Sequence, residues 1–314
     1  MGFSRNNCKG IELKILITCP RTEISKSIFD NLFSLKSAEV EYIFPKNQNF
    51  NSKEMEEIYN NHEILIVGDD KIDQDFLNSA NSLKHIIKWG KGVDNIDKEF
   101  CINNNITVSN SPGKLAKYVA EHGISLINSL NKNIQLNINS INDGKWFKKP
   151  SMTLFDKTIG FYGFGEIANE FVKLLKPYNV NIIFYDIKTL NNNFKQLSLE
   201  EVFVNSDVLV VSSELTKDNE GEINTNLIKK MNKNSIIINI SRGKIINEQD
   251  LISSLKNKLI RGAGLDVFDE EPISNNHEFL ELENIVVTCH NASNTDEASK
   301  EVNEEIIKMI DKLL

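Results

Sequence analysis

The chain has 314 residues, of which 40% are hydrophobic and 25% are charged. This balance is typical of a soluble globular protein and excludes a wholly disordered one, and at about 150 residues a domain the length predicts two domains. The 36 basic and 44 acidic residues give a net charge of −8, which argues against nucleic acid as the main partner, because phosphate binding needs a basic surface.

The lack of a recognisable targeting signal, together with the cysteine pattern, predicts a cytoplasmic protein with no membrane partner. No apolar run approaches the roughly 20 residues that span a bilayer, and the polar first ten residues lack the apolar core of a signal peptide. The four cysteines, Cys8, Cys19, Cys101 and Cys289, form no Cys-x-x-Cys pair. We therefore expect reduced thiols.

Short β-branched runs alternate with amphipathic segments through the first third of the chain. The expected strands are Leu13–Thr18, Val40–Ile43, Ile64–Val67, His85–Lys88 and Ile106–Val108. The expected helices are Glu23–Leu35, Lys53–Asn60, Gln74–Ala80 and Asp97–Ile102. This alternation predicts a parallel sheet with helices on both faces.

A Pro-Gly pair at 112–113 interrupts the pattern and predicts a hinge, after which one long helix is expected from Leu115 to about Ile141. A second alternating series follows. Its expected strands are Thr158–Tyr162, Asn181–Tyr185, Val208–Val211, Ser235–Ile240, Gly262–Val267 and Ile285–Val287. Its expected helices are Glu166–Leu175, Thr225–Met231 and Glu248–Leu255, and the last helix is Asp296–Leu314.

A glycine-rich turn at 163–168 is the strongest local signal. The strand that ends at Tyr162 runs into Gly163-Phe164-Gly165-Glu166-Ile167-Ala168, where a helix starts at once. In the dinucleotide fingerprint the first glycine permits the tight turn, the second lets the backbone approach the pyrophosphate, and a small third residue lets helix and strand pack closely. The alternative is an ordinary strand-to-helix turn.

Asp186 ends the next strand, 23 residues after Gly163. A carboxylate at this place accepts hydrogen bonds from the ribose hydroxyls and repels a 2′-phosphate, so Asp186 favours NAD over NADP. Glu166 fits less well, because its carboxylate falls beside the expected pyrophosphate unless it points to solvent.

Four further blocks complete the pattern: Lys88–Asp97 (KWGKGVDNID), Tyr118–His122 (YVAEH), Asn239–Gly243 (NISRG), and Gly262–Pro272 (GAGLDVFDEEP) followed by Thr288–Ser293 (TCHNAS). In this order and spacing the chain resembles the NAD-dependent D-isomer-specific 2-hydroxyacid dehydrogenases over nearly its whole length. The resemblance implies a Rossmann-type NAD-binding domain inserted into a flavodoxin-like substrate domain, both doubly wound α/β folds.

The chemistry of this family explains the residue types. Oxidation of a 2-hydroxy acid removes a proton and a hydride from one hydroxyl-bearing carbon while the carboxylate is held. Arg242 offers a planar fork for the carboxylate, and His290 exchanges the proton. Glu271 is expected to stabilise the protonated imidazole. The resemblance makes these three residues the catalytic Arg–Glu–His triad.

The resemblance also implies the binding residues. The cofactor set is Gly163, Phe164, Gly165, Glu166, Ile167, Asp186, Ser213, Ile240, Asp266 and Ser293, with Asp266 at the nicotinamide carboxamide. The substrate set is Lys88, Lys91, Gly92, Val93 and Arg242. His122 is assigned a helix-packing role, and no metal site is expected.

The substrate stays open at this point. Lys88 and Lys91 favour an anionic or phosphorylated acid, and the chain resembles most the short form of phosphoglycerate dehydrogenase, an enzyme of serine biosynthesis. Gly68, however, stands where that branch often has an arginine for the phosphate. Glyoxylate, hydroxypyruvate or another short 2-keto acid is the alternative. A third possibility, from another class, is a nicotinamide-sensing corepressor on the same fold; the ending at Leu314, without a recruitment tail, favours the enzyme.

The expected domains are 1–110 plus 291–314 for the substrate and 111–290 for NAD, with the active cleft between them. The long helix from Leu115 and its extension to Trp146-Phe147 are expected to form the interface of a homodimer, as the resemblance implies.

Overall fold

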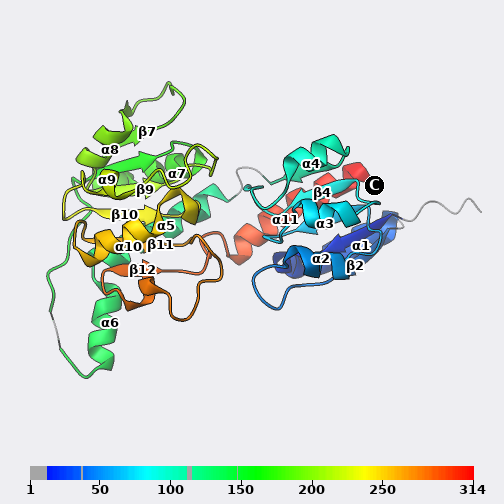
Figure 1. Ribbon diagram of the computed structural model, residues 1–314, viewed down its shortest axis with the longest axis horizontal. Coiled ribbons are helices and arrows are strands. Elements are labelled where there is room, and N and C mark those ends of the chain that lie inside the picture. The colour runs from blue at the N-terminus through cyan, green and yellow to red at the C-terminus, as the bar shows by residue number, and fades with distance from the viewer. Residues whose placement is uncertain (1–12, 37, 112–114, 147) are drawn as a thin grey trace, which may run out of the picture. The chain divides into compact units, whose positions relative to one another are not determined.

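The structure is a computed structural model that describes residues 13–36, 38–111, 115–146 and 148–314 (Figure 1). The chain divides into two compact units: unit 1 comprises Met1–Leu115 and Thr295–Leu314, and unit 2 comprises Ala116–Asn294. The breaks thus follow residues 115 and 294, whereas the sequence predicts boundaries after residues 110 and 290.

Unit 1 contains a parallel sheet with the strand order β2-β1-β3-β4-β5. Its strands are β1 (Lys14–Ile17), β2 (Glu39–Tyr42), β3 (Ile64–Val67), β4 (His85–Lys88) and β5 (Thr107–Asn110). Its helices are η1 (Pro20–Ser25), α1 (Lys26–Lys36), α2 (Ser52–Ile58), α3 (Gln74–Ser79), α4 (Lys98–Asn103) and α11 (Asp296–Leu313). This is the flavodoxin-like order, in which the chain changes direction across the sheet between β1 and β3.

The core of unit 1 lies on both faces of its sheet, because successive side chains of a strand point to opposite faces. Ile15 and Ile17 of β1 pack with Phe29 of α1 and with the buried side of α11. Leu16, between them, packs with Phe76 of α3 on the other face. The C-terminal helix α11 is therefore part of the same core as the N-terminal strand.

Unit 2 contains a parallel sheet with the strand order β12-β11-β10-β9-β6-β7-β8. Its strands are β6 (Thr158–Tyr162), β7 (Asn181–Tyr185), β8 (Lys195–Gln196), β9 (Val208–Val211), β10 (Ile236–Asn239), β11 (Gly262–Leu265) and β12 (Ile285–Val287). Its helices are α5 (Ala116–Asn131), α6 (Ile134–Asn142), α7 (Glu166–Leu175), η2 (Lys176–Tyr178), α8 (Leu199–Asn205), α9 (Thr225–Ile228), η3 (Gly243–Ile245), α10 (Glu248–Lys256) and η4 (Glu278–Glu281).

The order of unit 2 is the Rossmann order with one added strand, and its switch point lies between β6 and β9. In such sheets ligands bind at the carboxyl ends of the strands beside the switch point. The two doubly wound α/β folds expected from the sequence are confirmed.

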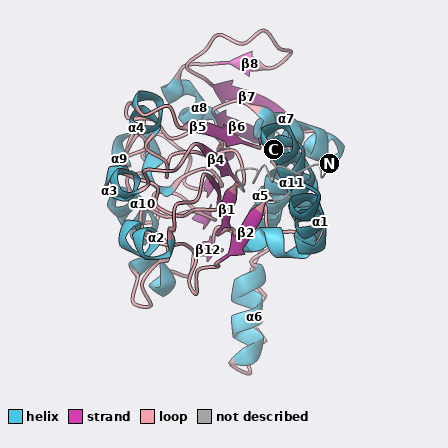
Figure 2. Cartoon of the chain, turned by 90° about the vertical axis from the view of Figure 1, so that its right-hand side faces the viewer, coloured by secondary structure: helices cyan, strands magenta, loops and turns pink. Residues whose placement is uncertain are grey.

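One expected element is wrong. The single helix from Leu115 to Ile141 is two helices, because Asn133 takes a left-handed backbone conformation (φ 52°) between α5 and α6. Asparagine tolerates this conformation better than most residues, and the Asn133 side-chain amide donates a hydrogen bond to the Pro150 carbonyl (3.1 Å). As a result α6 extends away from the rest of unit 2 (Figure 2).

Across the described parts of the chain, no helix combines the length and the apolar character needed to cross a bilayer.

Candidate active site

The glycine turn joins β6 to α7 at the switch point of unit 2. Gly163 has a positive φ of 84°, and a Cβ there would lie 2.7 Å from the Cα of Ser213. The Ser212 hydroxyl donates to the Gly163 carbonyl (2.8 Å), so the loop after β9 holds the turn from the other side. Only glycine satisfies both the backbone angle and this close approach.

Gly165 meets a different requirement. It is the N-cap of α7 with no side-chain cap hydrogen bond, and a Cβ built on it would have no atom within 4 Å. Space therefore lies open above the N-terminus of a ten-residue helix, where backbone N–H groups favour an anion. Both glycines fit the pyrophosphate of a dinucleotide.

Asp186 lies at the end of β7 and is tied to this turn. One carboxylate oxygen accepts the Phe164 N–H (2.9 Å) and the other accepts the Lys188 N–H (3.0 Å). A carboxylate has about four acceptor sites, so two bonds leave capacity for ribose hydroxyls. The acid that the sequence assigns to the cofactor thus also shapes the backbone of the glycine turn.

The other residues of the expected cofactor set fall into two groups. Phe164 and Ile240 are buried, and Phe164 stacks near Phe184 (4.4 Å between ring centroids), so its side chain belongs to the core. Glu166 is exposed, and Ile167, Ser213 and Ser293 are partly buried. The Ser213 hydroxyl donates to the Glu214 carbonyl (3.0 Å).

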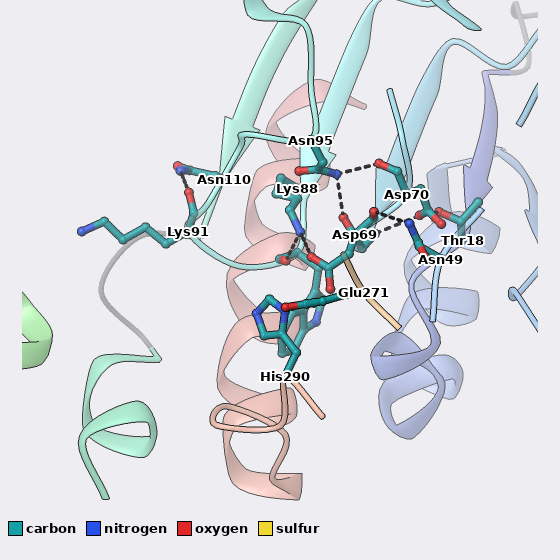
Figure 3. Close-up of polar contacts among 12 residues, drawn as sticks. Thr18, Asn49, Asp69, Asp70, Lys88, Lys91, Asn95, Asn110, Glu271 and His290 are labelled. Carbon is teal, nitrogen blue, oxygen red and sulfur yellow. Dashed lines mark hydrogen bonds and ion pairs between the residues drawn. The ribbon is translucent and has the colours of Figure 1, made fainter. Parts of the chain in front are cut away.

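The three residues of the expected triad follow the neighbouring strands β10, β11 and β12, whose carboxyl ends lie at one edge of the sheet. His290 Nδ1 lies 2.7 Å from a carboxylate oxygen of Glu271 (Figure 3). The second Glu271 oxygen accepts the Phe268 N–H (3.0 Å), which fixes the carboxylate. Arg242 directly precedes η3 as its N-cap, and its guanidinium donates to the Ser241 carbonyl (2.8 Å).

Asp266, expected at the nicotinamide, has its side chain in the interior: the residue is 0% exposed. Its carboxylate accepts the Asn291 and Ala292 N–H groups and the Thr288 hydroxyl. These three contacts within unit 2 are to the turn that carries His290.

Asp269, beside the candidate triad, was not singled out by sequence reasoning as a site residue. Its Oδ1 is buried, with no hydrogen-bond partner among the described residues. Burial first, and the nearby Glu248 carboxylate second, raise the pKa of Asp269 to about 6, although Lys244 lowers it in part. Glu248 also pairs with His277 (3.0 Å). The run of three acidic residues at 269–271 could be seen in the sequence. It did not show which of the three side chains would be buried.

In unit 1 the expected substrate residues are the last residue of β4, Lys88, and three residues of the loop after it. Lys88 is 4% exposed, and its ammonium binds Asp69 (2.8 Å) and the Trp89 carbonyl (3.3 Å) (Figure 3). Lys91 is exposed, and its carbonyl accepts the Asn110 side-chain amide (2.7 Å); Gly92 and Val93 are partly buried.

The loop after β3, which sequence reasoning noted only for Gly68, supplies the partner of Lys88. Asp70 is 1% exposed and accepts the Thr18 hydroxyl (2.6 Å) and the Phe50 N–H (2.9 Å). Burial raises the pKa of Asp70 more than these bonds lower it. The buried Asp70 thus fixes the loop on which Asp69 stands, at the switch point between β1 and β3. In the sequence, the available signal for this loop was the pair of acidic residues at 69–70, close after the expected strand Ile64–Val67.

Among the residues that the structure describes, no group of His, Cys, Asp and Glu side chains is arranged to hold a metal ion.

Comparison with known proteins identifies the family. The model for "D-isomer specific 2-hydroxyacid dehydrogenase, NAD binding domain" matches residues 124–292. A glyoxylate reductase from Pyrococcus furiosus is 30% identical over 309 residues, which cover 94% of this chain and 90% of that protein. A D-3-phosphoglycerate dehydrogenase from Methanocaldococcus jannaschii is 32% identical over 311 residues, which cover 96% of this chain but only 57% of that protein.

A solved structure agrees on the fold. D-Lactate dehydrogenase from Aquifex aeolicus, complexed with NAD and lactic acid, matches with a TM-score of 0.82 at 22% identity, over 95% of this chain and 94% of that one. The chain belongs to the NAD-dependent D-isomer-specific 2-hydroxyacid dehydrogenases.

Proposed function

We propose that the chain reduces a short 2-keto acid without a phosphate group to the 2-hydroxy acid, such as hydroxypyruvate to D-glycerate or glyoxylate to the achiral glycolate. NAD(H), when bound, supplies the hydride or accepts it in the reverse direction. The ion pair between Lys88 and Asp69 is the observation that carries the choice of substrate.

The proposed chemistry uses three side chains of unit 2. In reduction, protonated His290 gives its proton to the oxygen on C2 of the substrate, and in oxidation the neutral imidazole takes that proton back. Glu271 lies 2.7 Å from Nδ1, so it orients the ring and stabilises the imidazolium. Arg242 binds the substrate carboxylate through two N–H groups.

The substrate choice follows from charge at the carboxyl ends of β3 and β4. The Lys88 side chain is 5% exposed and that of Asp69 is 42% exposed, so the acidic partner is the more accessible one. The buried ammonium is neutralised by Asp69, and Gly68 adds no cation. A phosphate dianion at this end of unit 1 meets a carboxylate, whereas a hydroxymethyl group or a hydrogen atom meets no repulsion.

3-Phosphoglycerate, which the resemblance favours, is the second candidate, because the exposed Lys91 adds a positive charge to the substrate loop. The experiment that separates the two compares kcat/KM for hydroxypyruvate, glyoxylate and 3-phosphohydroxypyruvate with NADH. We expect the phosphorylated acid to be the poorer substrate by about tenfold or more, which corresponds to about 1.4 kcal/mol in the transition state. A higher kcat/KM for the phosphorylated acid contradicts the proposal.

A matched pair of variants ties the preference to Asp69. Asp69→Asn removes the accessible negative charge, and Lys88 is then no longer neutralised. The variant should therefore reduce the ratio of kcat/KM for the unphosphorylated acids to kcat/KM for 3-phosphohydroxypyruvate. Asp75→Asn removes the same charge from the exposed first turn of α3 and should leave the ratio as in the wild type.

We also propose that the protein is a homodimer in the cytoplasm. None of the α6 residues is buried, and Ile134, Ile138 and Ile141 lie on one face at 46%, 47% and 61% exposure. A second copy covering this face would remove the apolar surface from water. The free thiols of Cys19, Cys101 and Cys289 support a reducing compartment.

A further inference from the structure

The turn that carries His290 has a strained backbone and is attached to the buried residue Asp266. His290 has a φ of 48°, an uncommon value for a residue with a side chain. Its N–H donates to the Asp266 carbonyl (2.8 Å). The Asp266 carboxylate accepts the Asn291 N–H on one oxygen and the Ala292 N–H on the other, both at 2.8 Å. The backbone from His290 to Ala292 is therefore attached to one residue, and the Thr288 N–H donates to the carbonyl of the neighbouring Leu265 (2.9 Å).

A chain of side-chain hydrogen bonds continues from Asp266 to α5. The Thr288 hydroxyl donates to the Asp266 carboxylate (2.5 Å). Because its only proton is used there, the Thr288 oxygen accepts from His122 Nε2, which lies 3.0 Å away. His122 Nε2 is also 3.4 Å from the same Asp266 oxygen. His122 thus carries a proton on Nε2 that points to Thr288 and Asp266.

The Asp266 carboxylate depends on its hydrogen-bond donors because it is a charged group in the interior. The side chain of Asp266 is 1% exposed and that of His122 is 21% exposed. Burial alone raises the pKa of Asp266, but hydrogen bonds from His122, Thr288 and the two backbone N–H groups outweigh it and hold that pKa below its usual range. A buried carboxylate that loses one donor turns toward another or admits water. Either movement shifts the turn at 288–292.

We infer that His122 is a positioning residue for His290: through the Thr288 hydroxyl and the Asp266 carboxylate it holds the turn that sets the contact between His290 and Glu271. The inference rests on the proposed function. It gives His122 more than the helix-packing role expected from the sequence. The titratable groups that contact this turn in unit 2 include His122, Asp266 and Glu271.

The test is the pH–rate profile of keto-acid reduction with NADH. His122→Leu removes the donor, so the turn relaxes and the imidazolium of His290 loses part of its stabilisation by Glu271. We expect kcat to fall by about tenfold or more and the alkaline limb to move to lower pH. Glutamine in His122→Gln has an N–H donor on a side chain of similar length, so kcat and the alkaline limb should both return toward their wild-type values.

Three further variants make the test specific. Thr288→Val removes the next hydrogen bond in the series, from the Thr288 hydroxyl to Asp266, and should move the alkaline limb in the same direction. Combined with His122→Leu it should add little, because the two side chains act in series. His62→Leu is the matched control: it removes a buried histidine that contacts Glu41 (3.2 Å) in unit 1, and the limb should stay in place.

The outcomes separate this inference from the proposed function. A wild type that reduces no 2-keto acid contradicts the proposed function. A wild type that turns over, with an unmoved limb in folded His122→Leu or Thr288→Val, overturns the positioning role alone. If His122→Leu does not fold, an unmoved limb in Thr288→Val decides against the role, and a moved limb supports it.

Discussion

The Glu271 carboxylate has both oxygens engaged, one by His290 Nδ1 and one by the Phe268 N–H. A carboxylate held in this way acts on the imidazole without rotating away. Sequence reasoning named this acid from a run of three, and the structure shows the contact at 2.7 Å.

Glu271→Gln should shift the pH–rate profiles of both directions of the reaction to lower pH. Glutamine keeps a hydrogen-bond acceptor but not the charge, so the protonated form of His290 loses stabilisation. Keto-acid reduction needs that form, so its alkaline limb should move down by about one pH unit, and the acid limb of hydroxy-acid oxidation should move with it. Profiles measured in both directions check this. Limbs that stay where the wild type has them exclude Glu271 as the partner.

Asp269 predicts a pH dependence of stability. Burial first, and the Glu248 charge second, raise the pKa of Asp269 to about 6. Between the unfolded value near 4 and this value the folded state binds more protons than the unfolded state, so this group lowers stability as pH rises through that window. Asp269→Asn should therefore raise Tm at pH 8 and leave it nearly unchanged at pH 4. An equal change in Tm at both values contradicts the ionisation argument.

The strand–turn–helix element at 158–175 shows how far a local pattern predicts structure. Its bounds in the sequence and in the structure agree, because the glycine spacing and the apolar strand are local properties. The sequence did not show that Asp186 also holds the Phe164 N–H, since that contact depends on how β7 ends beside the turn.

The two glycines of this element should fail differently when each is changed to alanine. At Gly163 the positive φ alone costs about 1–2 kcal/mol, and the added Cβ would lie 2.7 Å from Ser213 Cα, so Gly163→Ala should lower the free energy of unfolding. At Gly165 the Cβ enters open space, so Gly165→Ala should lose less stability than Gly163→Ala, as expected for an N-cap change, but bind NADH more weakly. Denaturant titrations and NADH fluorescence titrations separate the two. A Gly165→Ala variant with wild-type NADH affinity would show that the pyrophosphate does not approach there.

Longer elements were less predictable than the turn. The periodicity of residues 115–141 is helical throughout, and nothing in it marks the left-handed residue Asn133 that divides α5 from α6. Lys88 was a similar case. A lysine at the end of a strand suggests an available charge, and only the folded loop at 68–70 shows that Asp69 neutralises it.

For the whole molecule, the alternation of strands and helices predicted parallel sheets covered by helices, because parallel strands need crossover connections. The two doubly wound units and the return of the last helix to the first unit were predicted from the family resemblance. Oligomeric state depends on a surface, which periodicity does not describe.

Ile138→Asp should convert the proposed dimer to a monomer. The residue is 47% exposed on α6, so a charge there leaves the folding of unit 2 intact but opposes burial against a second copy. Light scattering coupled to size exclusion measures the mass. Lys308→Asp, a charge change on an exposed side chain of α11 in unit 1, is the control. A wild type that is monomeric at micromolar concentration excludes the dimer.

Oxidation of NADH by a 2-keto acid, measured with the full chain, is the most direct test of the account. We expect the wild type to oxidise NADH with hydroxypyruvate or glyoxylate and to form D-glycerate or glycolate, respectively, in equal amount. His290→Ala should lose about 100-fold or more of this rate while its NADH affinity stays close to that of the wild type. A wild type that binds NADH but oxidises it with no 2-keto acid would contradict the account and favour a nicotinamide-sensing protein.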